Sequence, residues 1–495
     1  MFWRKRTPRV DGIHQKDETR SNARRRGRSA RPVVDALESR QLLAYGGAPI
    51  FAAAYNPTWP NWFPKAGTQL EDSDFATAAF QGLWGSVNGK GRNDLQTIQS
   101  AGFNTVRLYN WGPSREGRTA TGQPDGKFDA HLPFLDTAQA LGLKVIVPVS
   151  NYFLSNDKYA WNGQNPNAAL SFNSAPRSIQ IALDQFVASV TQNGRLDPAV
   201  GSIAIGNELD LGIQNDPGAT AKLARADWWV VNLEQALQKA FPGQIPQHFL
   251  TIPVSNADQG NVPPSVNPNP VSWFQIFADG AQKGEYMPVG TVTTPQFPSK
   301  TFTTDVVGLS QYPWFNSMFF NSVNMFQSGA QLQNTLTQYS TGQPTGSTWS
   351  DKWPGYKPTV PLLITELGTT RYQTTGAEQA QAVLDQAQIV VNQLQTSTNN
   401  VMGATIFEFN DEPNKNGYKE PEPNSELFFG LEQYTTDQSH FRDGTVMYHM
   451  NTGVTKFAGG YMAAMDYPVY SLIPVTTSSG QTVLSQLKGI FSVKA

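Results

Sequence analysis

The feature that most constrains the fold of this chain is an alternation, from residue 46 onward, of short apolar runs with longer segments of helical periodicity. Eight apolar runs are predicted to be strands: 50–55, 105–110, 144–151, 200–208, 248–256, 306–314, 361–368 and 403–411. Most are continuously apolar in the middle, which is typical of strands buried on both faces of a parallel sheet. The alternation predicts an α/β fold assembled from βα units.

Five segments between these runs carry apolar residues at helical spacing: 93–101, 129–141, 178–192, 220–240 and 377–395. Apolar side chains at i, i+3, i+4 and i+7 give a helix one buried stripe. Eight strands with intervening helices predict a (β/α)8 TIM barrel. A doubly wound open sheet is the alternative, but neither Gly-x-Gly-x-x-Gly nor Gly-x-x-x-x-Gly-Lys follows a predicted strand.

The connections differ in length according to which end of a strand they follow. Links from helix to strand are short, such as 102–104. The long segments rich in Gly, Pro and Asn follow strands: 111–128, 151–177, 256–300, 315–358 and 411–450. Segments that follow strands in a barrel lie on its C-terminal face, where active sites are built. The sequence therefore predicts one domain over residues 46–495, with large loop insertions on the C-terminal face of the barrel.

Residues 1–45 are predicted to be a separate basic segment. Residues 1–40 hold twelve Lys and Arg against five Asp and Glu. We expect the segment to be disordered, and a polyanion-binding arm is the alternative. It lacks the apolar stretch of a secretory signal, and the chain nowhere holds about 18 consecutive apolar residues, so no membrane span is predicted. The formal net charge of −2 argues against a nucleic-acid partner.

The composition excludes several kinds of chemistry. The chain has no cysteine, which excludes disulfide scaffolds, thiolate metal sites and a cysteine nucleophile. It has five histidines and no His-x-x-x-His spacing, so we expect no metal and no cofactor. Charged residues make up 15%, whereas 12 Trp, 16 Tyr and 28 Phe are present. A chain rich in aromatic residues and poor in charge suits a neutral, ring-shaped ligand.

Two glutamates end strands that are otherwise apolar. The fourth predicted strand ends in Asn207-Glu208, and the seventh ends in Glu366 followed by Leu367-Gly368. A buried carboxylate costs several kcal/mol unless it is paired or used in function. Strands four and seven lie nearly opposite each other in an eight-stranded barrel, so these two side chains are predicted to face one another. Carboxyl groups about 5–5.5 Å apart act as acid/base and nucleophile in retaining glycosidases. A strand-end cap or a salt bridge is the alternative for either glutamate alone.

Six short segments carry a further signal: Gly-Phe-Asn-Thr-Val-Arg-Leu-Tyr-Asn at 102–110, Ile-Gly-Asn-Glu at 205–208, Leu-Ser-Gln-Tyr-Pro-Trp-Phe at 309–315, Ile-Thr-Glu-Leu-Gly at 364–368, Phe-Glu-Phe-Asn-Asp-Glu-Pro-Asn-Lys at 407–415 and Glu-Leu-Phe-Phe-Gly-Leu at 426–431. In this order they resemble motifs of clan A of the glycoside hydrolases, specifically family 17, the β-1,3-glucanase group. The resemblance is scattered over residues 50–431. It departs from the family at Thr369-Thr370, where Trp-Pro is usual, and at Asn414, where Trp is usual.

The resemblance implies a retaining hydrolase of β-glucan, in the first place β-1,3-glucan, whose residues 46–495 form the catalytic domain. It implies Glu208 as acid/base and Glu366 as nucleophile, with Asn207 holding the sugar 2-hydroxyl and Tyr312 donating a hydrogen bond to the nucleophile. The remaining residues expected to bind substrate are Arg107, Tyr109, Trp314, Glu412 and Lys415. A glucan transglycosylase like those of family 72 and a non-catalytic glycan-binding barrel are the alternatives.

A last resemblance concerns residues 36–44, Ala-Leu-Glu-Ser-Arg-Gln-Leu-Leu-Ala. They resemble the Leu-Glu-Pro-Arg-x-Leu-Leu sorting element near the N-terminus of exported proteins of planctomycete-type bacteria, with Ser39 in place of the usual proline. The resemblance implies a protein that is secreted or held at the cell surface. We expect it to act as a monomer.

Overall fold

The structure of the chain is a computed structural model in which two compact units are distinguished, residues 1–40 and 41–495. The residues that it describes all belong to the second unit: 48–57, 74–86, 91–112, 130–155, 161–164, 166, 170–209, 217–255, 318–326, 328–341, 361–371, 374–396, 400–412, 428–434, 446–448, 467–469 and 472–492. The basic segment predicted at 1–45 lies outside them.

One parallel sheet of nine strands forms the centre of this unit. Its order is β7-β6-β3-β2-β1-β11-β10-β9-β8. The strands are β1 (Ile50–Ala54), β2 (Thr105–Arg107), β3 (Lys144–Val149), β6 (Val200–Ile205), β7 (Leu250–Thr251), β8 (Pro253–Ser255), β9 (Asn321–Asn324), β10 (Leu362–Leu367) and β11 (Val401–Ile406). Every pairing within this sheet is parallel.

The sheet closes into a barrel at β7 and β8, the two ends of this strand order. Only Ile252 separates β7 from β8, so these two short strands are halves of one strand. β7 pairs with β6, β8 pairs with β9, and Leu250 also forms a parallel bridge with Phe319. Eight strand positions therefore surround one core, and the predicted (β/α)8 TIM barrel is confirmed.

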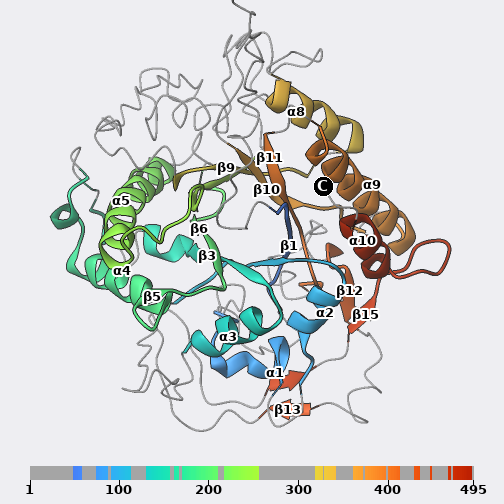
Figure 1. The fold of residues 1–495 in the computed structure, drawn as a ribbon, viewed down its shortest axis with the longest axis horizontal. Coiled ribbons are helices and arrows are strands. Elements are labelled where there is room, and N and C mark those ends of the chain that lie inside the picture. Colours follow the sequence, from blue (N-terminus) through green and yellow to red (C-terminus); the bar gives the residue numbers. More distant parts are fainter. Residues whose placement is uncertain are drawn as a thin grey trace, which may run out of the picture. The chain divides into compact units, whose positions relative to one another are not determined.

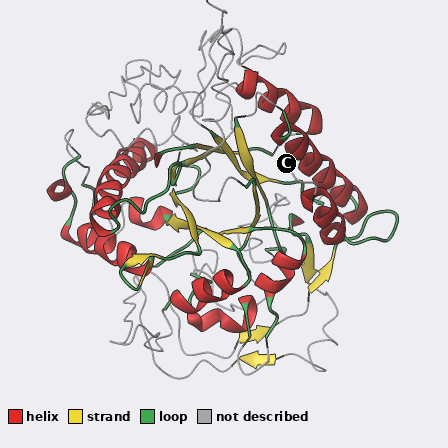
Figure 2. Cartoon of the chain, viewed as in Figure 1, coloured by secondary structure: helices red, strands yellow, loops and turns green. Residues whose placement is uncertain are grey.

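Helices surround the strands (Figures 1 and 2). Those described are α1 (Gln81–Trp84), α2 (Asp94–Ser100), α3 (Leu132–Ala140), α4 (Arg177–Ser189), α5 (Pro217–Ala240), α8 (Gly329–Thr341), α9 (Gly376–Leu394) and α10 (Val483–Ser492). In Figure 1, α4 and α5 lie on the left, α8, α9 and α10 on the right, and α1, α2 and α3 below. α9 packs on β11 and contacts both α8 and α10.

The long helix α9 shows why these segments are helical. Thr375 caps its first turn, since the Thr375 side chain accepts from the backbone N–H of Glu378 and the Glu378 side chain accepts from the backbone N–H of Thr375. Val383, Ala387 and Val390 then recur at helical spacing and are buried against the barrel. Helix α9 agrees to within one residue at each end with the segment predicted at 377–395.

The strand at the sixth position of the barrel, like the helices α1, α8 and α10, was not predicted from the sequence. The strand predicted at 306–314 lies outside the described residues, and β9 occupies the position between β8 and β10. Its sequence, Asn-Ser-Val-Asn, holds a single aliphatic residue, yet all four side chains are buried. Hydrogen bonds make this possible, because Asn321 Nδ2 donates to Tyr339 Oη at 2.8 Å and Thr251 Oγ1 donates to Ser322 Oγ at 2.7 Å.

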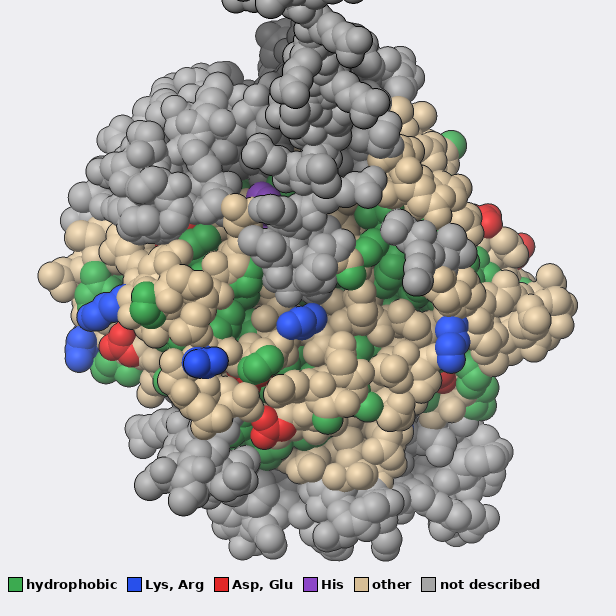
Figure 3. Space-filling view, viewed as in Figure 1, with side chains coloured by type: hydrophobic (Ala, Val, Ile, Leu, Met, Phe, Trp, Pro, Cys, Tyr) green, Lys and Arg blue, Asp and Glu red, His purple; other side chains and the backbone are tan. Residues whose placement is uncertain are grey.

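Three short antiparallel pairs lie outside the barrel: β4 (Thr191–Gln192) with β5 (Arg195–Leu196), β12 (Glu432–Tyr434) with β15 (Leu472–Pro474), and β13 (Val446–Tyr448) with β14 (Tyr467–Val469). The charged side chains on the coloured part of the face in Figure 3 are scattered and do not gather into a patch. None of the helices within the described ranges has the length and apolar character needed to cross a membrane.

A buried acidic group connects β12 to the start of the barrel. Tyr55 Oη donates to Asp94 Oδ2 at 2.8 Å, and Arg92 Nη2 donates to the same oxygen at 2.6 Å. Glu432 on β12 is buried beside them. Burial raises the pKa of Glu432 to about 7, with the Asp94 carboxylate adding to the increase and Arg92 opposing it. Glu432 therefore holds its proton in the folded protein at pH values where an exposed glutamate is ionised.

This raised pKa predicts a pH dependence of stability. The folded state binds the Glu432 proton more tightly than the unfolded chain does, so the contribution of Glu432 to the free energy of unfolding falls as pH rises from about 4.5 to about 7. We expect Glu432→Gln to increase the free energy of unfolding at pH 8 by about 1–3 kcal/mol and to leave it unchanged at pH 4. Urea denaturation at the two pH values measures this difference.

Asp385→Asn provides the control for this prediction, because Asp385 is an exposed acid on α9. It should leave the pH dependence as in the wild-type protein. An equal gain from Glu432→Gln at pH 4 and pH 8 would show that ionisation of Glu432 is not the cause.

Candidate active site

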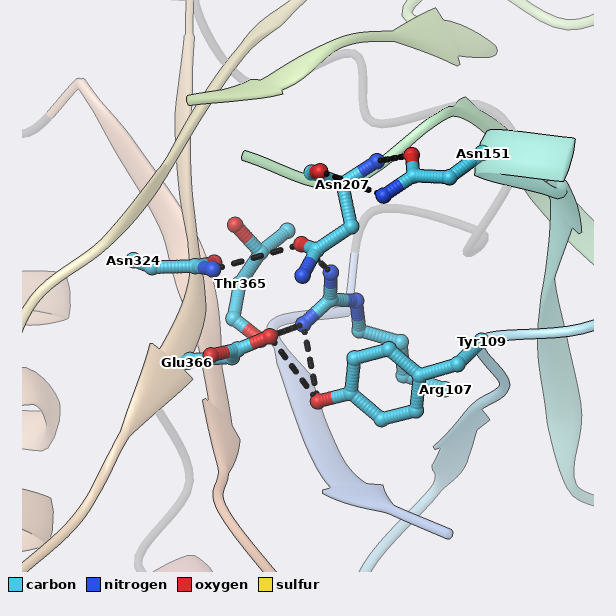
Figure 4. A network of polar contacts seen from close by, with 7 residues as sticks. All are labelled: Arg107, Tyr109, Asn151, Asn207, Asn324, Thr365 and Glu366. Atoms are coloured by element: carbon cyan, nitrogen blue, oxygen red, sulfur yellow. Dashed lines mark hydrogen bonds and ion pairs between the residues drawn. The ribbon is translucent and has the colours of Figure 1, made fainter. Parts of the chain in front are cut away.

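The candidate site lies at the carboxyl ends of the barrel strands. Arg107 is the last residue of β2, Glu366 lies near the end of β10, and Asn207 follows β6. Figure 4 shows their side chains pointing toward one another from these separate strands, together with Tyr109. Parallel strands of a barrel present their C-terminal ends on one face, which is why residues so distant in the sequence meet here.

Glu366 is held by two donors on one oxygen. Arg107 Nη1 donates to Glu366 Oε1 at 2.7 Å, and Tyr109 Oη donates to the same oxygen at 2.9 Å. The Glu366 side chain is 4% exposed. Hydrogen bonds from a guanidinium and a phenol stabilise the ionised form of a buried carboxylate. Within the described part of the chain Oε2 has no hydrogen-bond partner, so this second oxygen is the one left to act.

Arg107 connects both sides of the site. It is 1% exposed, and it also donates from Nη1 to the Thr365 carbonyl at 2.7 Å and from Nη2 to Asn207 Oδ1 at 2.6 Å. Burial acts to lower the pKa of Arg107, but Tyr109 and the carboxylates of Glu366 and Glu208 act against it, and the pKa is raised overall. One permanently charged guanidinium therefore lies within the electrostatic reach of both candidate catalytic carboxylates.

Tyr109 remains a neutral donor at every physiological pH. Burial raises its pKa well above the ordinary value, with Arg107 opposing the increase and the carboxylates of Glu366 and Glu408 adding to it. Its ring also packs edge-on against Phe407, with 6.1 Å between the ring centroids. Tyr109 is thus fixed in position, with its hydroxyl hydrogen committed to Glu366.

The turn that carries Glu208 has a constrained backbone. Gly206 has φ of +69°, and a Cβ there would lie 2.9 Å from side-chain carbons of Leu154 and Leu209, so only glycine fits. Glu208 itself has φ of +50°, a left-handed conformation that is unfavourable for a residue with a side chain. Its N–H donates to the Pro253 carbonyl at 2.9 Å, which holds this conformation in place.

Asn207, between these two residues, is fixed by Asn151. Asn207 N donates to Asn151 Oδ1 at 2.7 Å, and Asn151 Nδ2 donates to the Asn207 carbonyl at 3.0 Å. The pair of bonds connects the end of the fourth strand to the segment that follows β3. The left-handed backbone of Glu208 is strained, and such strain persists only where the surrounding contacts hold the backbone in place. Strained residues of this kind are concentrated at functional sites.

The strain at Glu208 gives a prediction. Glu208→Ala and Glu208→Gly both remove the carboxylate, but only glycine relieves the left-handed conformation. We expect the glycine variant to be more stable than the alanine variant by about 1 kcal/mol, although glycine ordinarily destabilises a fold relative to alanine. The difference in urea denaturation midpoints between these two variants measures it.

The matched control is the same pair of substitutions at Asp385, which lies inside α9, where alanine should be the more stable variant. An alanine variant at position 208 as stable as the glycine variant would contradict the strained geometry.

The structure places the remaining predicted site residues as follows. Tyr312, Trp314 and Lys415 lie outside the described residues. Tyr109, which the sequence analysis assigned to substrate binding, donates to Glu366 in the structure. The expected hydrogen bond from Tyr312 to Glu366 involves a residue outside the described ranges and stays a prediction. Glu412 is buried and accepts a hydrogen bond from Asn56 Nδ2, so it connects the segments that follow β11 and β1.

Two residues at the end of β9 were not predicted from the sequence. Asn324 Nδ2 donates to Asn207 Oδ1 at 3.2 Å, which adds a third amide to the site. Phe326 is 46% exposed and packs on Phe407 and Phe429, with ring centroids 5.7 and 5.3 Å away. The backbone N–H of Met325, between them, donates to the Glu366 carbonyl at 2.7 Å. An exposed aromatic ring therefore lies beside the strand that carries Glu366.

The aromatic residue Trp161 lies in the long segment that follows β3. Its side chain is completely buried, its Nε1 donates to the Phe153 carbonyl at 2.9 Å, and its ring packs edge-on against Trp228 at 5.6 Å. The structure therefore places Trp161 in the core of the loop region.

The site is built for proton and carboxylate chemistry. Nowhere in the described ranges do three or more His, Asp or Glu side chains gather in an arrangement that could hold a metal ion. The arrangement instead offers a buried carboxylate that accepts two hydrogen bonds on one oxygen, a second carboxylate on a strained turn, and an amide between them. These groups can attack an electrophilic carbon and transfer a proton at the same place.

No family model and no curated protein matches the sequence. Solved structures resemble the fold at low identity. A family 1 β-glucosidase from Thermotoga maritima is 12% identical, with 79% of this chain and 94% of that chain covered and a TM-score of 0.44. A glycoside hydrolase family 5 mannosidase from Rhizomucor miehei is 10% identical, with 90% and 93% covered and a TM-score of 0.41.

A β-glucuronidase from Bacteroides uniformis is 13% identical, with 72% of this chain covered and a TM-score of 0.37. The match spans only 33% of that longer chain. The assignment of the barrel rests on the strand pairing described above and not on these similarities.

Proposed function

We propose that this protein is a retaining glycoside hydrolase in which Glu366 is the nucleophile and Glu208 the acid/base. The observation that carries the proposal is the position of Arg107. Its guanidinium donates hydrogen bonds to both Glu366 and Asn207 and interacts electrostatically with Glu208. This brings the ends of the fourth and seventh strands to one point. A double displacement at an anomeric carbon requires two carboxyl groups that lie close to the same glycosidic bond and have different surroundings.

The first step divides the work between the two glutamates. Glu366 Oε2 attacks the anomeric carbon and forms an ester bond, while Glu208 gives its proton to the oxygen of the departing sugar as that glycosidic bond breaks. Arg107 and Tyr109, which both donate to Oε1, orient Glu366 before the attack. Because these donors are already in place, they do not have to reorganise as the charge moves.

The second step returns the enzyme to its starting state. Glu208, now ionised, takes a proton from a water molecule, and the resulting hydroxide attacks the anomeric carbon and displaces Glu366. Two inversions at one carbon retain its configuration. Arg107 compensates part of the negative charge on whichever carboxylate is ionised, because both lie within its reach.

The substrate that we propose is a β-glucan, in the first place β-1,3-glucan. This rests on the motifs that resemble family 17, above all Asn207-Glu208 and the segment 407–415. The exposed ring of Phe326 is consistent with a sugar substrate, because the C–H faces of a sugar ring stack on aromatic side chains. The neutral, aromatic-rich composition agrees with an uncharged polysaccharide.

We also propose that the protein acts outside the cytoplasm, as a secreted or cell-surface enzyme. The support is the sequence of residues 36–44, which resembles a bacterial sorting element. Deleting residues 36–44 should leave the protein in the cytoplasmic fraction of its host if this segment directs export.

The experiment for the function is a comparison of purified protein on β-1,3-, β-1,4- and mixed-linkage glucans. We expect new reducing ends from the β-1,3-glucan, at a rate at least about 1,000-fold above that of Glu366→Gln, since this variant keeps the shape of the side chain and loses the nucleophile. Reducing-end assays with analysis of product length measure both rate and mode.

Three outcomes separate the candidates. Products shorter than the substrate support hydrolysis, whereas products longer than the substrate would identify a transglycosylase of the same clan. Binding of β-glucan without turnover would identify a non-catalytic barrel and would overturn the proposal.

A further inference from the structure

We propose that Asn324 is a positioning residue that, together with Arg107, holds the Asn207 amide in the direction in which Asn207 presents its N–H donors to a substrate hydroxyl. The inference deepens the proposed function and rests on it. It concerns the end of β9, where the sequence carries no motif of the resembling family.

Hydrogen-bond chemistry fixes the direction of both amides. A guanidinium has donors only, so the atom of Asn207 that lies 2.6 Å from Arg107 Nη2 must be the oxygen. This oxygen is an acceptor only, so the atom of Asn324 that lies 3.2 Å from it must be the nitrogen. Arg107 therefore determines the orientation of Asn207 and, through it, that of Asn324 (Figure 4).

Two donors on Asn207 Oδ1 leave its nitrogen for another partner. Among the residues that the structure describes, no acceptor is bonded to Asn207 Nδ2, and the side chain is half-buried and not sealed in the core. Rotating the amide by 180° would set its N–H groups against the donors of both Arg107 and Asn324. Asn324 thus adds a second hydrogen bond that must break before Asn207 can turn its donor away from the substrate.

Position on the strand supports this assignment. Successive residues of β9 point to opposite sides of the sheet, and Asn321 bonds to Tyr339 of α8 on the outer side. Asn324 points inward and is 2% exposed. Its Oδ1 is buried and has no hydrogen-bond partner within the described part of the chain, which is unfavourable for folding.

The test compares 4-nitrophenyl β-glucoside with its 2-deoxy analogue, which lacks the hydroxyl that Asn207 would bind. Asn324→Leu has a similar volume and no donor. We expect it to lower kcat/KM on the parent substrate by at least about tenfold and on the 2-deoxy substrate by less than about twofold. Asn324→His, whose ring N–H can donate, should recover part of the loss on the parent substrate.

Asn321→Leu is the matched control, because it removes a buried amide of the same strand that bonds outside the site. It should lower the melting temperature and leave the ratio of the two substrates unchanged.

Equal losses on both substrates with Asn324→Leu would overturn the positioning role, even with the proposed function intact. Absence of turnover of both glycosides and of every β-glucan by the wild-type protein would instead overturn the proposed function, and this inference with it.

Discussion

The ion pair between Arg107 and Glu366 is the interaction on which the rest of the site depends. Both side chains lie almost entirely out of water, where an unpaired charge is very unfavourable. Each is tolerable because the other is present, and removing one partner of such a pair typically costs about 3–5 kcal/mol. Arg107 and Glu366 come from strands two and seven, so the pair also holds opposite sides of the barrel interior at a fixed separation.

The remaining groups add to this pair in layers. Tyr109 shares the Glu366 oxygen with Arg107, and Asn207 receives the second nitrogen of the guanidinium. Asn151, in the segment that follows β3, and Asn324, at the end of β9, then hold Asn207. Arg107 can only donate, so its bonds fix which atom of Asn207 faces it and which oxygen of Glu366 is engaged. The network thereby positions the proposed catalytic groups before any substrate arrives.

Much of this could be predicted from the sequence where the signal is local. Continuous apolar runs predict strands buried on both faces. A carboxylate at the end of such a run, as at Glu366, is unfavourable unless it is paired or has a function. These two patterns were sufficient to predict the barrel and to select Glu208 and Glu366 as candidates.

The rest depends on contacts between distant residues. β9 is buried because Tyr339 and Thr251 satisfy its polar side chains, and neither partner is visible in the sequence of the strand. The hydrogen bond from Tyr109 to Glu366 likewise depends on where two strand ends lie in space. The exposure of the Phe326 side chain depends on how the surrounding side chains pack, and the spacing of apolar residues in the sequence does not encode it.

The central claim is that Glu366 forms the bond to sugar and Glu208 transfers the proton. The most direct measurement is the anomeric configuration of the glycosyl azide formed when azide and an activated β-glycoside are given to two variants. Azide that replaces the nucleophile attacks the substrate itself, so Glu366→Gly should give the α-azide. Azide that replaces the second-step water attacks the glycosyl-enzyme, so Glu208→Ala should give the β-azide. The opposite pair of products, read by nuclear magnetic resonance, would contradict the account.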